Sequence, residues 1–224
     1  MQGDVLGCPC LDLRGLYPII DVDSLRARGL APLAFAERVL AARPRLVQLR
    51  AKSSGARETL ELLRGLRPRC SRAGTLLFAN DRPDLAVLAQ ADGVHVGQLD
   101  LSPADVRAFA PGLLVGVSTH GLDELEAALA ARPSYVAFGP VFTTNSKQNP
   151  EPVVGSDALA RAHELARRAG VPLVAIGGID LERASELRSR AELAAVIGAL
   201  IPASGALEEV TVRAEALEAA LRGA

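Results

Sequence analysis

The chain lacks an excess of charge of either sign. Its 224 residues carry 25 lysines and arginines against 26 aspartates and glutamates. A protein that binds nucleic acid or an anionic membrane through its overall field needs a basic excess. The sequence therefore predicts no nucleic-acid partner, and any charge chemistry is expected to be local.

Long apolar runs are also missing. The longest, such as 171–176, fall far short of the roughly 18 residues that span a bilayer. The start of the chain has no basic segment followed by an apolar one, as a signal peptide would. We therefore expect a cytoplasmic protein without a membrane partner.

Cysteine and histidine are scarce, with three of each. An odd number of cysteines argues against a disulfide framework. Cys8 and Cys10 are close in sequence, but no second pair or nearby histidine completes a metal site with them. The other cysteine and the histidines are too dispersed to suggest a ligand cluster: Cys70, His95, His120 and His163.

A repeated unit organises the chain: a short aliphatic run, a polar or glycine-bearing ending, and a helical stretch of ten or more residues. Nearly continuous apolar residues indicate parallel strands that are buried on both faces. Helix starts are expected at Pro32, at Pro83, at Ser102 and at Asp180. The eight runs are 16–20, 46–49, 75–79, 93–96, 114–117, 135–138, 173–176 and 194–197.

Eight such units favour one closed (β/α)8 TIM barrel, although periodicity alone leaves an open, doubly wound sheet possible. No linker or charge block divides the chain. We expect one domain over 1–224, with an extension at 1–14, the barrel at 15–203 and a C-terminal helix at 204–224. A homo-oligomer is compatible with the sequence, which does not define the assembly.

Polar residues follow nearly every strand, where β/α barrels place their active sites. Gln48, Arg50 and Lys52 alternate along the end of the second strand, so their side chains share one side and form a cationic clamp. The alternative is a solvated basic loop. Asp81 and Asp100 follow the third and fourth strands and suggest a Mg²⁺-diphosphate site. For Asp81 a helix cap before Pro83 is the alternative.

The remaining strands end in hydroxyls and glycines. After the fifth strand, Ser118 and His120 could orient a substrate, or the segment could cap the next helix through Asp123. An irregular stretch over 141–156 is expected to be an active-site loop, with two hydroxyls and a cation for an anionic group: Thr144, Ser146 and Lys147. Glycines at the last two strand ends suit a backbone phosphate cradle, or only tight turns: Gly177, Gly178 and Gly198.

Six segments, in order, resemble the thiamine phosphate synthase family. They are VQLRAK at 47–52, NDRPD at 80–84, ADGVHVGQLD at 91–100, GVSTH at 116–120, FGPVF at 138–142 and AIGGI at 175–179. The resemblance runs from about residue 16 to 200. It implies an alkyl transferase that joins 4-amino-2-methyl-5-hydroxymethylpyrimidine diphosphate to 4-methyl-5-(2-hydroxyethyl)thiazole phosphate. Diphosphate leaves first in that family, and the thiazole nitrogen attacks the resulting pyrimidine cation.

The resemblance also implies roles for individual residues. Asp81 and Asp100 would bind Mg²⁺, and Ser118 would approach the reacting groups. Arg50, Lys52, Ser118 and Lys147 are the expected catalytic residues. The pyrimidine diphosphate would be held by Gln48, Arg50, Lys52, Asn80 and Lys147. The thiazole phosphate would be held by Thr144, Ser146 and the backbone around Gly177, Gly178, Ile197 and Gly198.

Two positions depart from the family pattern. The family's long loop commonly reads Thr-x-Thr-Lys, and this chain has Ser146 in place of the second threonine. Gly198 stands where serine is common, so the phosphate cradle lacks one hydroxyl. Two other functions stay open: a thiazole tautomerase-like enzyme that uses His120, and a non-catalytic protein that binds a phosphorylated thiamine-pathway ligand.

Overall fold

Eight parallel strands form a closed barrel in the computed structural model, which describes residues 13–143 and 152–223. Consecutive strands pair in chain order, and β1 also pairs with β8, with Leu16 opposite Ala194. This closure confirms the TIM barrel and excludes the open sheet. The strands are β1 (Gly15–Asp21), β2 (Leu46–Arg50), β3 (Leu76–Asn80), β4 (Gly93–Val96), β5 (Leu114–Thr119), β6 (Tyr135–Phe138), β7 (Leu173–Ile176) and β8 (Leu193–Val196).

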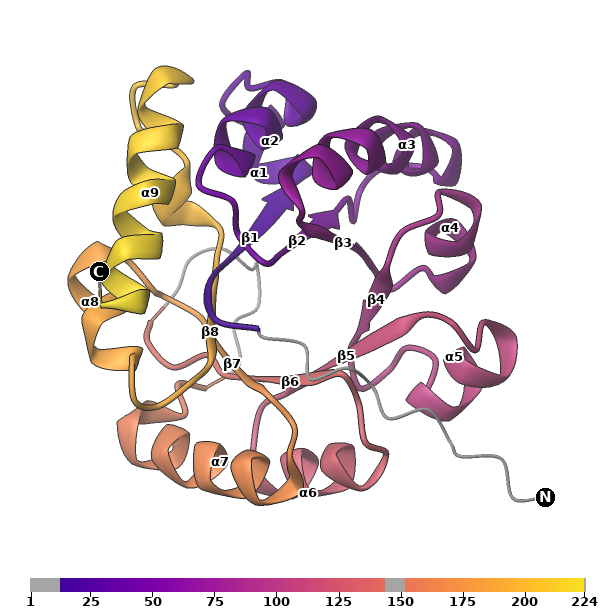
Figure 1. The fold of residues 1–224 in the computed structure, drawn as a ribbon, viewed down its shortest axis with the longest axis vertical. Helices are drawn as coiled ribbons and strands as arrows, with labels where there is room; N and C mark the ends of the chain where they lie inside the picture. Colours follow the sequence, from indigo (N-terminus) through magenta and orange to yellow (C-terminus); the bar gives the residue numbers. More distant parts are fainter. Residues whose placement is uncertain (1–12, 144–151, 224) are drawn as a thin grey trace.

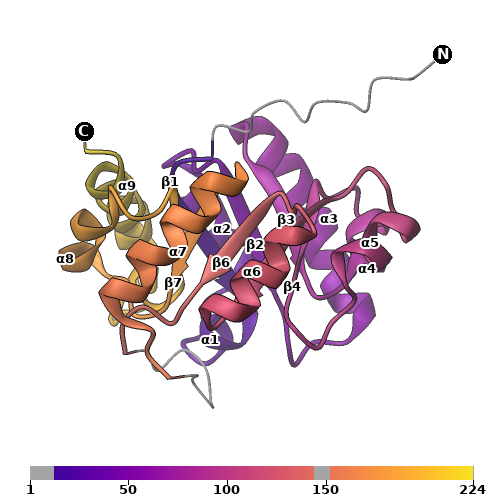
Figure 2. The ribbon, with the colours of Figure 1, turned by 90° about the horizontal axis from the view of Figure 1, so that it is seen from below.

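Helices surround the barrel on all sides, as Figure 1 shows in a view along its axis and Figure 2 from the side. Helix α9 packs beside α2 and β1, next to the point where the barrel closes. The helices are α1 (Val22–Arg26), α2 (Pro32–Leu40), α3 (Ala56–Ala73), α4 (Pro83–Leu88), α5 (Pro103–Phe109), α6 (Leu122–Ala130), α7 (Gly155–Ala169), α8 (Leu181–Ala184) and α9 (Glu208–Arg222), with one-turn helices η1 (Ser185–Leu187) and η2 (Gly198–Leu200).

The expected helix starts are confirmed, but the expected helix lengths are wrong in places. Pro32, Pro83 and Pro103 occupy the first turns of α2, α4 and α5, where their missing N–H groups cost nothing. Ser102 and Asp180 cap α5 and α8 with their side chains. Helices α4, α5 and α8 have only 6, 7 and 4 residues. The sequence predicts longer helices because the apolar residues continue beyond the helix ends, where they still face the core.

The apolar core has two parts. The larger part lies between the barrel and the surrounding helices, and a smaller cluster fills the barrel interior. Three large aromatic side chains dominate that interior, with the Tyr135 ring 5.6 Å from that of Tyr17 and 5.5 Å from that of Phe78. Gly116 makes room for Tyr135, because a Cβ there would lie 2.1 Å from the ring. Two of these aromatics carry hydroxyls, so the interior is not entirely apolar.

The described helices include none with the length and apolar character needed to cross a bilayer.

The irregular stretch expected over 141–156 is shorter at its end, because α7 begins at Gly155. The division of the chain into extension, barrel and C-terminal helix stays a prediction.

Candidate active site

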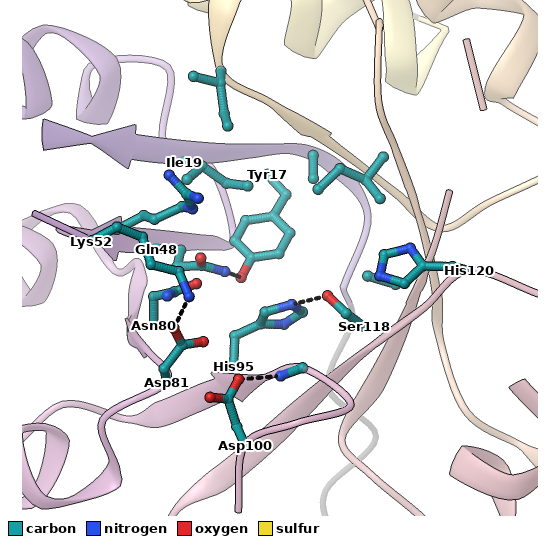
Figure 3. A pocket seen from close by; sticks show the side chains of 16 residues that line it. Tyr17, Ile19, Gln48, Lys52, Asn80, Asp81, His95, Asp100, Ser118 and His120 are labelled. Atoms are coloured by element: carbon teal, nitrogen blue, oxygen red, sulfur yellow. Dashed lines mark hydrogen bonds and ion pairs between the residues drawn. The ribbon is translucent and has the colours of Figure 1, made fainter. Parts of the chain in front are cut away.

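One cavity of about 280 Å³ opens among the carboxyl ends of the strands. Its volume is close to the lower end of typical small-molecule sites, roughly 300–1,000 Å³. Figure 3 shows side chains from several strands around it. The lining residues are Tyr17, Ile19, Gln48, Arg50, Lys52, Asn80, Asp81, His95, Gly97, Asp100, Ser118, His120, Ala137, Ile176, Ala195 and Ile197.

The three residues of the expected cationic clamp line this cavity together. Gln48 is 2% exposed and points into the barrel, whereas the Lys52 side chain is 51% exposed at the rim. Arg50 lies between them at the end of β2. The alternation along β2 therefore places Gln48 and Arg50 on one side, and Lys52, in the turn after the strand, lines the same cavity. A solvated basic loop does not describe Gln48 and Arg50.

Asp21 is a buried carboxylate that the sequence analysis did not select. It ends β1, lies opposite Arg50 in the barrel register and accepts a hydrogen bond from Nη1 of Arg50 at 2.5 Å. Its other oxygen accepts from the backbone N–H of Ser24 and caps α1. A guanidinium has five N–H donors, so this contact fixes Arg50 and leaves further donors for an anion.

Asp81 has an uncommon backbone conformation, with a φ of +61°. Aspartate and asparagine tolerate the left-handed region better than other residues with a side chain. The Asp81 carboxylate pairs with the Lys52 amine, which Figure 3 shows turned toward it. The helix-cap alternative is wrong, because Arg82 occupies the N-cap position of α4 and no side chain caps that helix.

Asp100 accepts a hydrogen bond from the backbone N–H of Gly97 at 2.8 Å. Burial raises the pKa of Asp100, and the adjacent Asp81 carboxylate adds to the increase. Two neighbouring carboxylates of this kind suit a divalent cation. Mg²⁺ is commonly held by one or two carboxylates together with substrate phosphate oxygens and water, so the pair fits although no larger acidic or histidine group forms among the described residues.

Ser118 lies at the end of β5 and its hydroxyl contacts Nε2 of His95 at 2.8 Å. His120 also lines the cavity, and its Nδ1 lies 2.7 Å from the carbonyl oxygen of Gly139. Capping through Asp123 is not observed, because Gly121 precedes α6 without a side-chain cap. Two histidines that are far apart in sequence thus meet at one site.

The backbone after β7 adopts a conformation that requires glycine at two successive positions. Gly177 and Gly178 have φ values of +99° and +66°, and a Cβ on Gly178 would lie 2.4 Å from the carbonyl oxygen of Thr143. Ile176 and Ile197 line the cavity at the ends of β7 and β8, whereas Gly177, Gly178 and Gly198 are not among its described lining residues. The three loop residues selected from the sequence lie outside the described residues: Thr144, Ser146 and Lys147.

Four polar residues that line or support the cavity were missed: Tyr17, Asp21, His95 and Tyr135. A continuous apolar run does not show which side chains face the barrel interior, so the two tyrosines could not be separated from ordinary core. Asp21 could have been found, because it follows the first strand as Asn80 and Asp81 follow the third. His95 was set aside because the other histidines are distant in sequence. Sequence distance is a poor guide here, because parallel strands bring distant residues together at one end of the barrel.

Comparison with known proteins identifies the family. A model of the thiamine monophosphate synthase family matches residues 16–200. The chain belongs to the thiamine monophosphate synthase family. The match covers every strand except the first residue of β1, and it confirms the resemblance read from the six sequence segments.

Curated members of the thiamine monophosphate synthase family are similar over most of their length. The thiamine-phosphate synthase of Koribacter versatilis is 44% identical over 85% of this chain and 90% of its own. That of Myxococcus xanthus is 42% identical over 94% and 95%. A solved thiamine phosphate pyrophosphorylase from Pyrococcus furiosus superposes with a TM-score of 0.82 at 29% identity, over 96% of this chain and 98% of that one.

Proposed function

We propose that the protein is a thiamine phosphate synthase, an alkyl transferase of thiamine biosynthesis. It would join 4-amino-2-methyl-5-hydroxymethylpyrimidine diphosphate to 4-methyl-5-(2-hydroxyethyl)thiazole phosphate and release diphosphate. One observation carries the proposal, which is that five side chains line one small-molecule cavity in a chain of this family: Arg50, Lys52, Asp81, Asp100 and Ser118. Family membership supports the reaction, and the cavity supports the residue roles.

The cationic clamp suits a reaction in which the leaving group departs first. The bond between the pyrimidine methylene carbon and the diphosphate oxygen breaks, and its electron pair leaves with the diphosphate. Arg50 and Lys52 would receive the growing negative charge, with Lys147 as a third cation. Removing one preorganised donor of this kind typically costs about 3 kcal/mol of transition-state stabilisation. The thiazole nitrogen then forms the new bond with its lone pair.

Asp81 and Asp100 would hold Mg²⁺ together with the diphosphate. When bound, the ion supplies electrostatic stabilisation of the leaving diphosphate. Both carboxylates line the cavity, where burial and, to a smaller extent, the adjacent Asp81 raise the pKa of Asp100. Lys52 now pairs with Asp81, so diphosphate binding would let the amine turn to a phosphate oxygen while the carboxylate turns to the metal.

The two heterocycles would occupy different parts of the cavity. Gln48, Asn80 and Ser118 would contact the pyrimidine diphosphate. The thiazole phosphate would lie toward β7 and β8, at the backbone of Gly177, Gly178, Ile197 and Gly198, with Thr144 and Ser146 as hydroxyl donors. Ile176 and Ile197, which line the cavity on this side, would pack against the thiazole ring.

The decisive experiment supplies purified protein with both substrates and Mg²⁺. We expect equal amounts of thiamine phosphate and diphosphate, detected by thiochrome fluorescence and by a coupled diphosphate assay. Each substrate alone serves as the control. If saturating substrates yield no thiamine phosphate, the synthase proposal is wrong.

The tautomerase-like alternative has one observation in its favour, which is that His120 lines the cavity with its Nδ1 held by the Gly139 carbonyl. It gives no use to Arg50, Lys52, Asp81 and Asp100, so we rank it second. Incubation with a thiazole carboxylate phosphate tests it, because isomerisation without coupling would favour this alternative. Ligand binding without any turnover would instead favour the non-catalytic phosphate-ligand protein.

A further inference from the structure

A chain of hydrogen bonds crosses the barrel interior at the floor of the cavity, which four of its five members line: Gln48, Tyr17, His95 and Ser118. Nε2 of Gln48 donates to the Tyr17 hydroxyl at 2.6 Å, and that hydroxyl lies 2.6 Å from the hydroxyl of Tyr135. Tyr135 contacts Nδ1 of His95 at 2.9 Å, and Nε2 of His95 contacts Ser118 at 2.8 Å. The five side chains come from β2, β1, β6, β4 and β5, and Figure 3 shows Gln48, Tyr17, His95 and Ser118 near one another.

Tyr17, Gln48, His95 and Tyr135 are buried and Ser118 is half-buried, so each buried hydrogen must find an acceptor. Tyr17 and Tyr135 are 1% and 0% exposed, and burial raises the pKa of both phenols well above the ordinary value, so both stay protonated. A buried polar group without a partner costs roughly 1–3 kcal/mol. The chain is therefore expected to run with a single direction of donation.

The direction follows from its first member. Because Gln48 donates to Tyr17, the hydrogen of Tyr17 goes on to Tyr135, its other partner among the described residues. Tyr135 then donates to Nδ1 of His95. This leaves Nδ1 without a hydrogen and places the hydrogen on Nε2, which donates to Ser118.

Both ends of the chain reach the cavity. Ser118 accepts from His95, so its own O–H is left to donate into the cavity. At the other end, one N–H of the Gln48 amide donates to Tyr17, and this contact orients the amide so that its Oε1 is left to accept. A 4-aminopyrimidine has the complementary pattern, because its amino group donates and its ring nitrogens accept. A 4-oxo ring carries an acceptor in place of the amino donor.

We infer that His95 is a positioning residue whose tautomer, set through Tyr17 and Tyr135, makes the site selective for an amino over an oxo pyrimidine. The inference rests on the proposed function, since it concerns how the same cavity recognises its pyrimidine. His95 acts through Ser118, and the two tyrosines act through His95. None of the three needs to exchange a proton with substrate.

The tautomer can be measured without substrate. Two-bond ¹H–¹⁵N correlation spectra at pH 8 distinguish a hydrogen on Nε2 from one on Nδ1, and a His95→Gln variant assigns the signal. We expect the Nε2–H form at His95. His120 is the internal contrast, because its Nδ1 faces a carbonyl oxygen that can only accept, which requires the Nδ1–H form. A hydrogen on Nδ1 of His95 would overturn the inference.

Two variants at His95 separate positioning from packing. A glutamine amide nitrogen can approach the place of Nε2 and donate to Ser118, whereas an asparagine amide is shorter and reaches only toward Tyr135. We expect His95→Gln to keep the selectivity, measured as the ratio of kcat/KM for the 4-amino and 4-oxo pyrimidine diphosphates. His95→Asn should lower that ratio about 10-fold or more, the cost of one misplaced hydrogen bond.

Tyr135→Phe and Phe78→Leu form a second matched pair inside the barrel. The first removes a hydroxyl from the chain and should also lower the ratio. The second disturbs the packing on Tyr135 but leaves every hydrogen bond from Gln48 to Ser118 in place. It should lower the free energy of unfolding and leave the ratio of kcat/KM values unchanged. Equal ratios in wild type, His95→Asn and Tyr135→Phe would refute the inference. A wild type without coupling activity would refute the proposed function instead, and the tautomer spectrum would still decide the direction of the chain.

Discussion

Asp21 holds Arg50 from behind: the carboxylate is 2% exposed and accepts from the guanidinium at 2.5 Å, while the Arg50 side chain is 19% exposed toward the cavity. A buried charge pair is a weak source of net stability, because desolvation offsets much of the attraction. Its value here is geometric. A guanidinium fixed before substrate arrives loses less conformational freedom when it binds a phosphate.

Asp21→Asn is predicted to lower kcat/KM for the pyrimidine diphosphate by about 10-fold or more, because Arg50 loses a charge-assisted hydrogen bond. Asparagine is a good N-cap residue, so the contact with Ser24 and the start of α1 should persist. Asp21→Ala removes the cap as well. Its free energy of unfolding, measured by urea denaturation, should be about 1 kcal/mol lower than that of Asp21→Asn. Unchanged steady-state kinetics in Asp21→Asn would show that Arg50 needs no such support.

Substitutions at Asp81 separate its backbone from its carboxylate. Asp81→Asn should keep the fold, since asparagine also tolerates a φ of +61°, and should reduce turnover by orders of magnitude if the residue binds Mg²⁺. Asp81→Ala should reduce turnover equally and also lower the free energy of unfolding by about 1–3 kcal/mol through backbone strain. Urea denaturation and the diphosphate assay measure the two effects. Full activity in Asp81→Asn would exclude the metal role.

Asp100→Asn is predicted to stabilise the protein in the absence of Mg²⁺. A folded-state pKa above the ordinary 3.8 means that the native state binds this proton more tightly than the unfolded state. The carboxylate therefore disfavours folding at neutral pH, and this effect disappears as the pH falls toward 3.8. The variant should melt higher than wild type at pH 7 and lose that advantage in acid, while needing more Mg²⁺ for activity. A lower melting temperature at pH 7 would contradict this account.

Gly198→Ser tests the departure at the end of β8. Gly198 begins η2 and does not have a positive φ, so serine fits its backbone. If the missing hydroxyl weakens the phosphate cradle, the variant should have a lower KM for the thiazole phosphate and the same KM for the pyrimidine diphosphate. Gly198→Ala is the control, because it adds a Cβ without a donor. A KM that is equal or higher in the serine variant would argue against the idea.

Cys70 is predicted to be inert toward thiol reagents in the native protein. Burial raises the pKa of this thiol to about 12, so only about one molecule in ten thousand carries the reactive thiolate at pH 8. A Cys8→Ser/Cys10→Ser variant isolates the position. Ellman's reagent should modify no thiol in the native variant and one in guanidinium chloride. Rapid modification of the native variant would show that Cys70 is accessible.

Much of the fold was predictable because parallel strands buried on both faces leave continuous apolar runs, and because Ser102 and Asp180 carry their capping function in their side chains. The residues that line the candidate site were partly predictable by the same logic, since polar residues directly after such runs meet at one end of a closed barrel. Tyr17, Tyr135 and His95 were not predictable. Their importance depends on which side of a strand faces the barrel interior, and a run that is apolar on both sides does not show this.

The hydrogen-bond chain from Gln48 to Ser118 also limits how this protein can diverge. Its members lie on five different strands, and the rings of Tyr17 and Tyr135 belong to the cluster that fills the barrel interior. An inherited change at Tyr135 or His95 would therefore alter substrate preference and core volume in one step. Descendants that accept a different heterocycle should show paired replacements on facing strands, rather than changes confined to the loops above the barrel.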